Sequence, residues 1–212
     1  MPLRDTLSGI NELYKQGAFK RFGISNFLAP QVEEIVAITK ELGFVAPTVY
    51  QGNYNAVARR TEDEVLPVLR KHGLSFYAYS PIAGGFLSKS KDQLLNPEGR
   101  FGSATVIGSM YNAMYNKPSL VAALDTWEQV AQEEGASRAE LAYRWVVYHS
   151  KLRGELGDAI IIGARTEEQL RETAEAVRKG PLSEAAAKKI GDMWESVKAD
   201  SSLDNFESRR SA

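Results

Sequence analysis

The sequence predicts an α/β fold in which about four parallel strands alternate with helices. Short apolar runs that end in turn residues alternate with longer stretches of helical periodicity. Capping-box patterns begin three of the predicted helices, at residues 61–64, 137–140 and 166–169. Strands that alternate with helices in this way form a parallel sheet through right-handed crossovers.

The first elements follow one another closely. Residues 3–16 carry an apolar face with helical spacing and end before Gly17, a residue type that commonly terminates helices. A short apolar run at 21–24 predicts the first strand. The next helix is expected to begin near Pro30, since proline is favoured in the first helical turn, and to end before Gly43.

The middle of the chain repeats the pattern. Residues 45–51 predict the second strand and residues 74–79 the third. The helix between them starts at the capping box of 61–64, and Pro67 is expected to bend it. Residues 80–118 show no clear period, and a loop of that length is usually functional or disordered.

The last third contains the fourth strand and further helices. Ala159–Ile162 is entirely apolar, which is typical of a strand buried on both faces. Periodicity and capping boxes predict helices over 119–134, 137–149, 166–178 and 183–198. No domain boundary is evident, so we expect one domain over residues 1–198. Residues 199–212 are expected to form a polar tail that frays.

Composition excludes several classes of protein. Lys plus Arg number 26 and Asp plus Glu 27, so neither a nucleic acid nor a membrane surface is expected as a partner. The chain has no cysteine, which excludes disulfides and thiolate metal sites, and its two histidines are far apart, so no metal site is expected. We see neither a signal peptide nor an apolar run of the roughly 18–20 residues that a membrane helix needs, and we expect a cytoplasmic protein.

Polar and glycine residues gather where the predicted strands end, which is where parallel α/β folds bind ligands. Ser25 and Asn26 follow the first strand, Gln51 ends the second, and a Gly-containing segment follows the third. Arg165 follows the fourth strand and precedes a helix N-terminus, a combination that suits a phosphate.

Each of these features also has a purely structural interpretation. Ser25-Asn26 could be a turn, Gln51 could be solvated, and Gly84-Gly85 could provide loop flexibility. Arg165 could be an ordinary surface arginine, and Thr166 with Gln169 is explained by helix capping alone. His72 and His149 each end a predicted helix, so neither is expected to be catalytic.

Four motifs, in order, resemble the aldo-keto reductases. They are GISNF at 23–27, VYQ at 49–51, YAYSPIAGGFL at 77–87 and IGARTEEQL at 162–170. The chain is most similar to the aflatoxin-aldehyde reductases and their fungal relatives, with support from YQGNYNAVAR at 50–59 and GRFG at 99–102. The resemblance covers the chain to about residue 198. It implies a (β/α)8 TIM barrel that reduces aldehydes and ketones to alcohols with NADP(H).

The resemblance also implies roles for individual residues. Ser25, Asn26 and Gln51 would bind the nicotinamide carboxamide, and Tyr79 would stack on the ring. Backbone N–H groups of the segment after the third strand would surround the pyrophosphate, and residues near the fourth strand would hold the adenosine 2′-phosphate end. The cofactor residues implied beyond those four are Ser80, Pro81, Ile82, Ala83, Gly84, Gly85, Phe86, Leu87, Arg100, Ala164, Arg165 and Gln169. Thr173 replaces a family Asn in the adenine-binding helix, which would weaken that contact.

The resemblance starts at the helix that follows the family's fourth strand. The family's catalytic Asp, Tyr, Lys and His lie on its first four strands, so we expect no catalytic residue in this chain and very little turnover. The expected fold is therefore a partial (β/α)8 barrel, the carboxyl-terminal half, in a truncated gene product or an incomplete gene model.

A half-barrel would have two open sheet edges and an uncovered inner face. A second copy or a complementing half-barrel could cover them, or the chain could persist as a marginally stable open sheet. The alternatives are a non-catalytic protein that binds NADP(H) or a partner, and a doubly wound open sheet unrelated to barrels. The sequence lacks the glycine fingerprint of the latter.

Overall fold

The computed structural model of the chain describes residues 2–95, 101 and 105–207. Within them lies one four-stranded sheet, in which every neighbouring pair of strands is parallel and the order is β1-β2-β3-β4. The strands are β1 (Gly23–Ser25), β2 (Val49–Asn53), β3 (Ser75–Tyr79) and β4 (Ala159–Ile160). The predicted α/β fold with about four parallel strands is confirmed, and it agrees with a partial (β/α)8 barrel.

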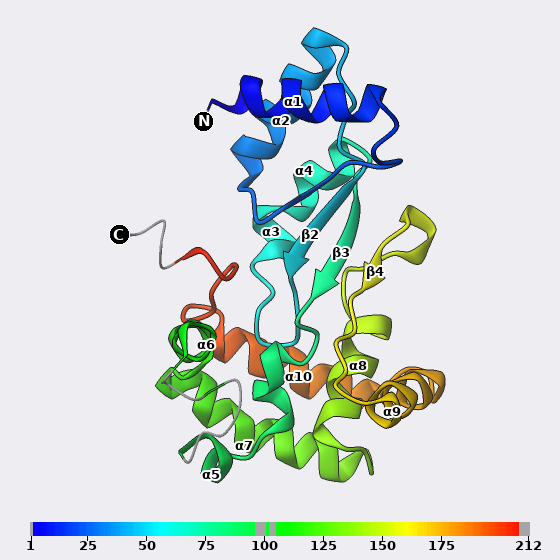
Figure 1. Ribbon diagram of the computed structural model, residues 1–212. Coiled ribbons are helices and arrows are strands. Elements are labelled where there is room, and N and C mark those ends of the chain that lie inside the picture. Colours follow the sequence, from blue (N-terminus) through cyan, green and yellow to red (C-terminus); the bar gives the residue numbers. More distant parts are fainter. Residues whose placement is uncertain (1, 96–100, 102–104, 208–212) are drawn as a thin grey trace.

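Helices surround the sheet, and in Figure 1 the helices from α6 onward gather below the arrowheads of β2 and β3, while α1 and α2 lie at the opposite end. In chain order they are α1 (Leu3–Lys15), α2 (Ala29–Leu42), α3 (Thr61–Glu64), α4 (Leu66–Lys71), the 3₁₀ helix η1 (Ala83–Ser88), α5 (Lys91–Leu95), α6 (Val106–Tyr115), α7 (Pro118–Glu133), α8 (Arg138–Tyr148), the 3₁₀ helix η3 (Gly154–Leu156), α9 (Glu167–Arg178) and α10 (Glu184–Val197).

Two of the three predicted capping boxes provide the expected caps. The Ser137 hydroxyl accepts from the backbone N–H of Glu140 at 3.1 Å, and the Thr166 hydroxyl from that of Gln169 at 3.2 Å. The box at Thr61 is wrong, because that hydroxyl points back to the carbonyl of Asn53. The helix there is interrupted at Val65, and α4 starts anew with its proline in the first turn, so the expected distortion is present.

One face of the sheet is packed and the other is open. Ile24, Tyr50 and Phe76 lie on the packed face and are buried. Their neighbours along the strands, such as Ser25 and Gln51, point to the other side and are exposed. Parallel sheets are usually covered on both faces, so an open inner face is what a half-barrel predicts.

The expectation of a doubly buried fourth strand is wrong. Only Ala159 and Ile160 pair with β3, and Ala159 is exposed while Ile160 is half-buried. Ile161 is 36% exposed. The reason is position, because β4 is the last strand of the sheet and the face that a full barrel would bury is open.

Two segments that were expected to lack regular structure are ordered where the structure describes them. The described parts of 80–118 contain η1, α5, α6 and the start of α7. Residues 200–207 are not frayed: Leu203 is 5% exposed, and the Ser201 hydroxyl donates to the carbonyl of Val57 at 3.0 Å. Arg60 forms an ion pair with Glu207 across this tail. The tail is polar, but these polar side chains have partners in the domain.

Candidate functional site at the carboxyl ends of the strands

The ends of the first three strands are joined by hydrogen bonds. Ser25 of β1 lies opposite Gln51 of β2, and the backbone N–H of Asn26 donates to the Gln51 carbonyl at 3.3 Å. The Tyr79 hydroxyl, at the end of β3, donates to Oδ1 of Asn26 at 2.8 Å. The structure therefore brings together the four residues to which the resemblance assigns the nicotinamide, and it leaves the side chains of Ser25 and Gln51 exposed.

Backbone strain concentrates at the same place. Among the described residues, the non-glycine residues with positive φ are Asn26 (60°), Ser80 (55°) and Ala83 (53°). All three belong to the predicted cofactor set. A positive φ disfavours residues with a Cβ, and such strain collects at ligand sites because surrounding contacts hold it in place.

The glycine-containing segment after β3 is a packed turn and not a flexible loop. Gly84 has φ of 67°, and a Cβ built there would lie 2.2 Å from Cε1 of Tyr111. Gly85 has φ of 106°. The indole N–H of Trp127 donates to the Leu87 carbonyl at 2.9 Å and fixes the end of the turn.

The side chains of this turn divide into two groups. Ala83, Phe86 and Leu87 are fully buried and anchor η1 in the core, and Pro81 and Gly84 are buried as well. Ser80, Ile82 and Gly85 remain partly exposed, so these residues form the accessible side of the turn.

A buried polar network supports the turn from below, and the sequence analysis did not identify it. The Asn55 amide donates to the Ser80 carbonyl at 3.1 Å and to the Tyr115 hydroxyl at 3.2 Å. The same hydroxyl donates to Oδ1 of Asn53 at 3.2 Å. Burial raises the pKa of Tyr115 to about 12, so the hydroxyl keeps its proton and remains a donor. The available signal was a pair of asparagines at a strand end, Asn53 as the last residue of β2 and Asn55 two residues later.

Arg165 lies beside the first turn of α9. Its backbone N–H donates to Oε1 of Gln169 at 2.9 Å, so Gln169 caps the helix, as the structural interpretation of this residue proposed. The guanidinium of Arg165 has no partner among the described residues and, like Ala164, is exposed. Arg100, the other predicted arginine, lies outside the described residues.

The carboxyl-terminal tail lies against the ends of β1 and β3 at this site. Burial and the nearby carboxylate of Asp204 raise the pKa of Tyr79 far above its ordinary value. Phe206 lines a cavity of about 260 Å³ together with Ser25, Asn26 and Phe27. The tail is therefore part of the wall around the candidate site.

Two tyrosines near the strand ends have other partners. The Tyr50 hydroxyl donates to the carbonyl of Phe27 at 2.8 Å, and that of Tyr54 donates to Glu62 at 2.7 Å. Burial and the Glu62 carboxylate raise the pKa of Tyr54 well above its usual range. Both side chains are buried, so neither hydroxyl faces the open side of the sheet.

The histidines have structural contacts. Nε2 of His149 accepts from the backbone N–H of Leu182 at 2.8 Å, and His72 contacts Glu33 at 2.7 Å. In the described part of the chain, no group of three His, Cys, Asp or Glu side chains is arranged to hold a metal ion. None of the described helices is both long and apolar enough to cross a membrane.

Comparison with known proteins identifies the family. The sequence model of the aldo/keto reductase family matches residues 1–195. The chain belongs to the aldo/keto reductase family.

Relatives within the family include fungal and mammalian proteins. The chain is 41% identical to oxidoreductase sirO of Leptosphaeria maculans over 198 residues, which cover 93% of the chain and 60% of that protein. It is 36% identical to aflatoxin B1 aldehyde reductase member 2 of Rattus norvegicus, over 92% of the chain and 55% of the relative. An aldo-keto reductase of Pseudocercospora fijiensis is 38% identical, over 93% and 67% respectively. The chain thus spans little more than half to two thirds of these relatives.

Proposed function

We propose that this aldo/keto reductase chain supplies the NADP(H)-binding half of an oxidoreductase that reduces aldehydes or ketones to alcohols. The carrying observation is the coincidence of Asn26, Ser80 and Ala83, three strained positions, with the ends of the strands at which the cofactor is expected. In this proposal the enzyme is cytoplasmic, and the acid that protonates the substrate oxygen comes from outside these residues.

The chemistry of the side chains suits this cofactor. The exposed hydroxyl and amide of Ser25 and Gln51 match the donor and acceptor groups of a carboxamide. The guanidinium of Arg165, beside a helix N-terminus, suits a phosphate monoester, and the 2′-phosphate distinguishes NADPH from NADH. When bound, NADPH supplies the hydride.

The Tyr79 side chain has two separable parts in this proposal. Its ring provides the stacking surface, and its hydroxyl holds Asn26 in the positive-φ conformation through the 2.8 Å hydrogen bond. Binding of the cofactor would need both the ring and the hydroxyl, because the ring stacks on the nicotinamide and the hydroxyl positions Asn26 to hydrogen-bond the carboxamide.

The test is a fluorescence titration with NADPH and with NADH. We expect Arg165→Glu to weaken NADPH binding by about tenfold, the equivalent of one charge-assisted hydrogen bond, and to leave NADH binding nearly unchanged. Arg178→Glu, at the other end of the same helix, is the matched control. Tyr79→Phe should bind better than Tyr79→Leu. Equal affinities of all these variants would contradict the assignment of the site.

Catalysis is tested separately by NADPH oxidation with 4-nitrobenzaldehyde. We expect the chain alone to turn over far below about 1 s⁻¹, the low end for ordinary enzymes. A rate at or above that value would show that the chain itself carries a competent proton donor, and the division of labour proposed here would be wrong.

A second candidate function, a partner-binding protein, is favoured by the open sheet face. The inner face exposes Gln51, and the outer edges of β1 and β4 have no strand partner among the described residues. The fitting partner is a second copy or a complementing half-barrel. Light scattering after gel filtration distinguishes a dimer from a monomer, and addition of the first four β/α units of a relative tests complementation by recovery of activity.

A further inference from the structure

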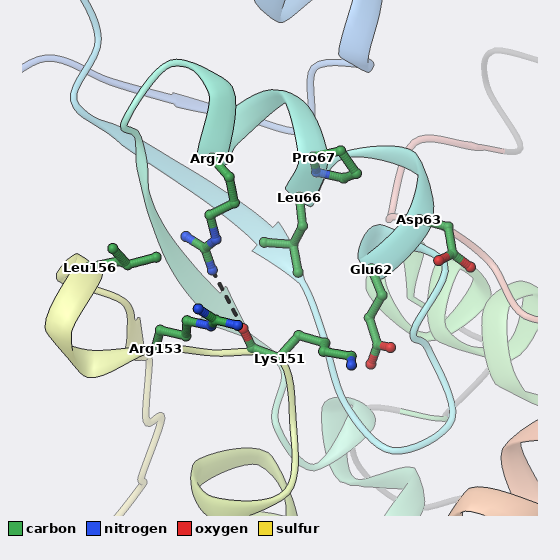
Figure 2. A pocket seen from close by; sticks show the side chains of 8 residues that line it. All are labelled: Glu62, Asp63, Leu66, Pro67, Arg70, Lys151, Arg153 and Leu156. Carbon is green, nitrogen blue, oxygen red and sulfur yellow. Dashed lines mark hydrogen bonds between the residues drawn. The ribbon is translucent and has the colours of Figure 1, made fainter.

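A groove with an apolar floor lies on the outer side of the sheet, away from the residues predicted to bind the cofactor. It separates α3 and α4 from the segment 151–156, as Figure 2 shows. Its volume is about 410 Å³, which is within the range of small-molecule sites. None of the residues that line it belongs to the predicted cofactor set.

The floor of the groove is apolar. Leu66 and Leu156 point into it from opposite sides in Figure 2, and Pro67 continues the apolar surface. Leu156 is 45% exposed, so its side chain is accessible from the groove. A flat hydrophobic body would bury this side chain.

One side of the groove is basic, and its charges are available. Neither the Lys151 ammonium nor the Arg153 guanidinium has a partner among the described residues. By contrast, the Arg70 guanidinium is held by Asp158, whose side chain is fully buried. Arg70 also reaches the Lys151 carbonyl at 3.5 Å, the contact drawn in Figure 2.

The backbone that carries these two cations is fixed at both residues. The Lys151 N–H donates to the Tyr54 hydroxyl at 2.9 Å, and the Arg153 N–H donates to Oδ2 of Asp158 at 2.8 Å. Asp158 also accepts from the backbone N–H of Phe76 in the sheet. The backbone of both residues is therefore held by buried groups, which lowers the conformational entropy lost when these side chains bind a ligand.

The end of the Lys151 side chain lies toward Glu62 in Figure 2, but among the described residues neither Lys151 nor Arg153 forms an ion pair with an acidic residue of the groove. Glu62 accepts from Arg59 at 2.8 Å and from Tyr54 at 2.7 Å, so its charge is already neutralised. Asp63 is exposed and lies at the far end of the groove from Arg153 in Figure 2. An anion beside Lys151 and Arg153 would therefore meet two unpaired positive charges.

From this arrangement we infer that the groove binds a small aromatic anion, with its ring on Leu66, Pro67 and Leu156 and its carboxylate or sulfonate between Lys151 and Arg153. The inference does not depend on the proposed cofactor function. It adds a second ligand site on the outer surface of the half-barrel.

The probe for the test is 8-anilinonaphthalene-1-sulfonate, followed by its fluorescence in the presence of saturating NADP⁺. The oxidised cofactor does not fluoresce, and it occupies the strand-end site if that site binds nucleotides. We expect Lys151→Glu/Arg153→Glu to weaken binding of the probe by about tenfold or more, because two charge-assisted contacts become repulsive. Lys40→Glu/Arg178→Glu makes the same change of net charge elsewhere and should leave the affinity within about twofold.

The apolar half of the site is tested by Leu156→Asp. Its control is Leu42→Asp on α2, where a leucine of similar exposure, 41% against 45%, lies away from the groove. Only Leu156→Asp should weaken binding of the probe. Circular dichroism is used to check that each variant is folded. If both groove variants bind the probe as tightly as their controls do, the groove is not the site and the inference is wrong.

Discussion

Replacement of Gly84 by alanine should destabilise the chain more than the same change at another left-handed glycine. Gly84 lies in η1 with φ of 67° and ψ of 10°. The new Cβ would lie 2.2 Å from Cε1 of Tyr111, far inside van der Waals contact. That ring packs between Phe101 and Tyr115, with ring centroids 5.8 Å and 6.2 Å away, so it has little room to retreat.

The cost has two parts. A left-handed conformation costs a residue with a Cβ about 1–2 kcal/mol. Overpacking against a buried ring adds about 1–3 kcal/mol. Gly43 isolates the first part, because it has φ of 64° and ψ of 30° and no atom within 4 Å of a built Cβ. We therefore expect Gly43→Ala to cost about 1–2 kcal/mol and Gly84→Ala about 2–5 kcal/mol.

Urea unfolding followed by circular dichroism measures both costs. A third variant, Gly84→Ala/Tyr111→Leu, removes the ring that the methyl group meets, so the alanine should cost less in that background than in the wild type. If Gly84→Ala is no worse than Gly43→Ala, or if Tyr111→Leu does not change its cost, the close approach of turn and ring is not what requires glycine.

Three further predictions concern the packed parts of the chain. Burial lowers the pKa of His149, so the unfolded chain takes up the proton first as the pH falls. The urea midpoint of unfolding should therefore decrease below about pH 6.5. The decrease should be smaller in His149→Gln, whose amide oxygen can still accept from the backbone N–H of Leu182. Glu62→Gln should cost about 3 kcal/mol in urea unfolding because it leaves the charge of Arg59 largely buried without its partner, and a cost below about 1 kcal/mol would contradict that role. Deletion of residues 199–212 should lower the free energy of unfolding by about 2 kcal/mol, the value for burial of one leucine, Leu203, whereas an unchanged free energy would mean that the tail does not stabilise the domain.

The sequence predicted elements well where the signal is local. Ser137 and Thr166 are caps because a hydroxyl three residues before a free N–H needs no distant partner. Thr61 has the same pattern and fails, since its hydroxyl lies within reach of the Asn53 carbonyl and that contact replaces the cap. The difference is tertiary, so no local pattern reports it.

Burial of the fourth strand could not be derived from its composition. Ala159–Ile162 is as apolar as a strand covered on both sides, yet Ile161 is 36% exposed. Composition records the surroundings to which a strand is adapted, whereas exposure records the surroundings present in this chain. The mismatch marks the place where the sheet is open.

For the candidate site, the residue types were predictable and their conformations were not. Ser25, Asn26 and Gln51 were identified because polar groups at strand ends suit a ligand. The local sequence does not predict a positive φ at Ser80 or Ala83, since neither serine nor alanine favours that conformation. That conformation is imposed by contacts from other elements, which only the fold brings into place.

The contacts that hold the turn after β3 predict that cofactor binding and catalysis can be measured independently of each other. The turn after β3 is held by Asn55, Tyr115 and Trp127, which all belong to this chain and are all buried in it. The geometry of the turn therefore does not depend on whatever covers the open inner face. Binding of the pyrophosphate should survive in the isolated chain, whereas proton transfer should require a partner. An added half-barrel that raises turnover with little change in NADPH affinity would support this separation, and a parallel rise of both would show that the turn is completed from outside.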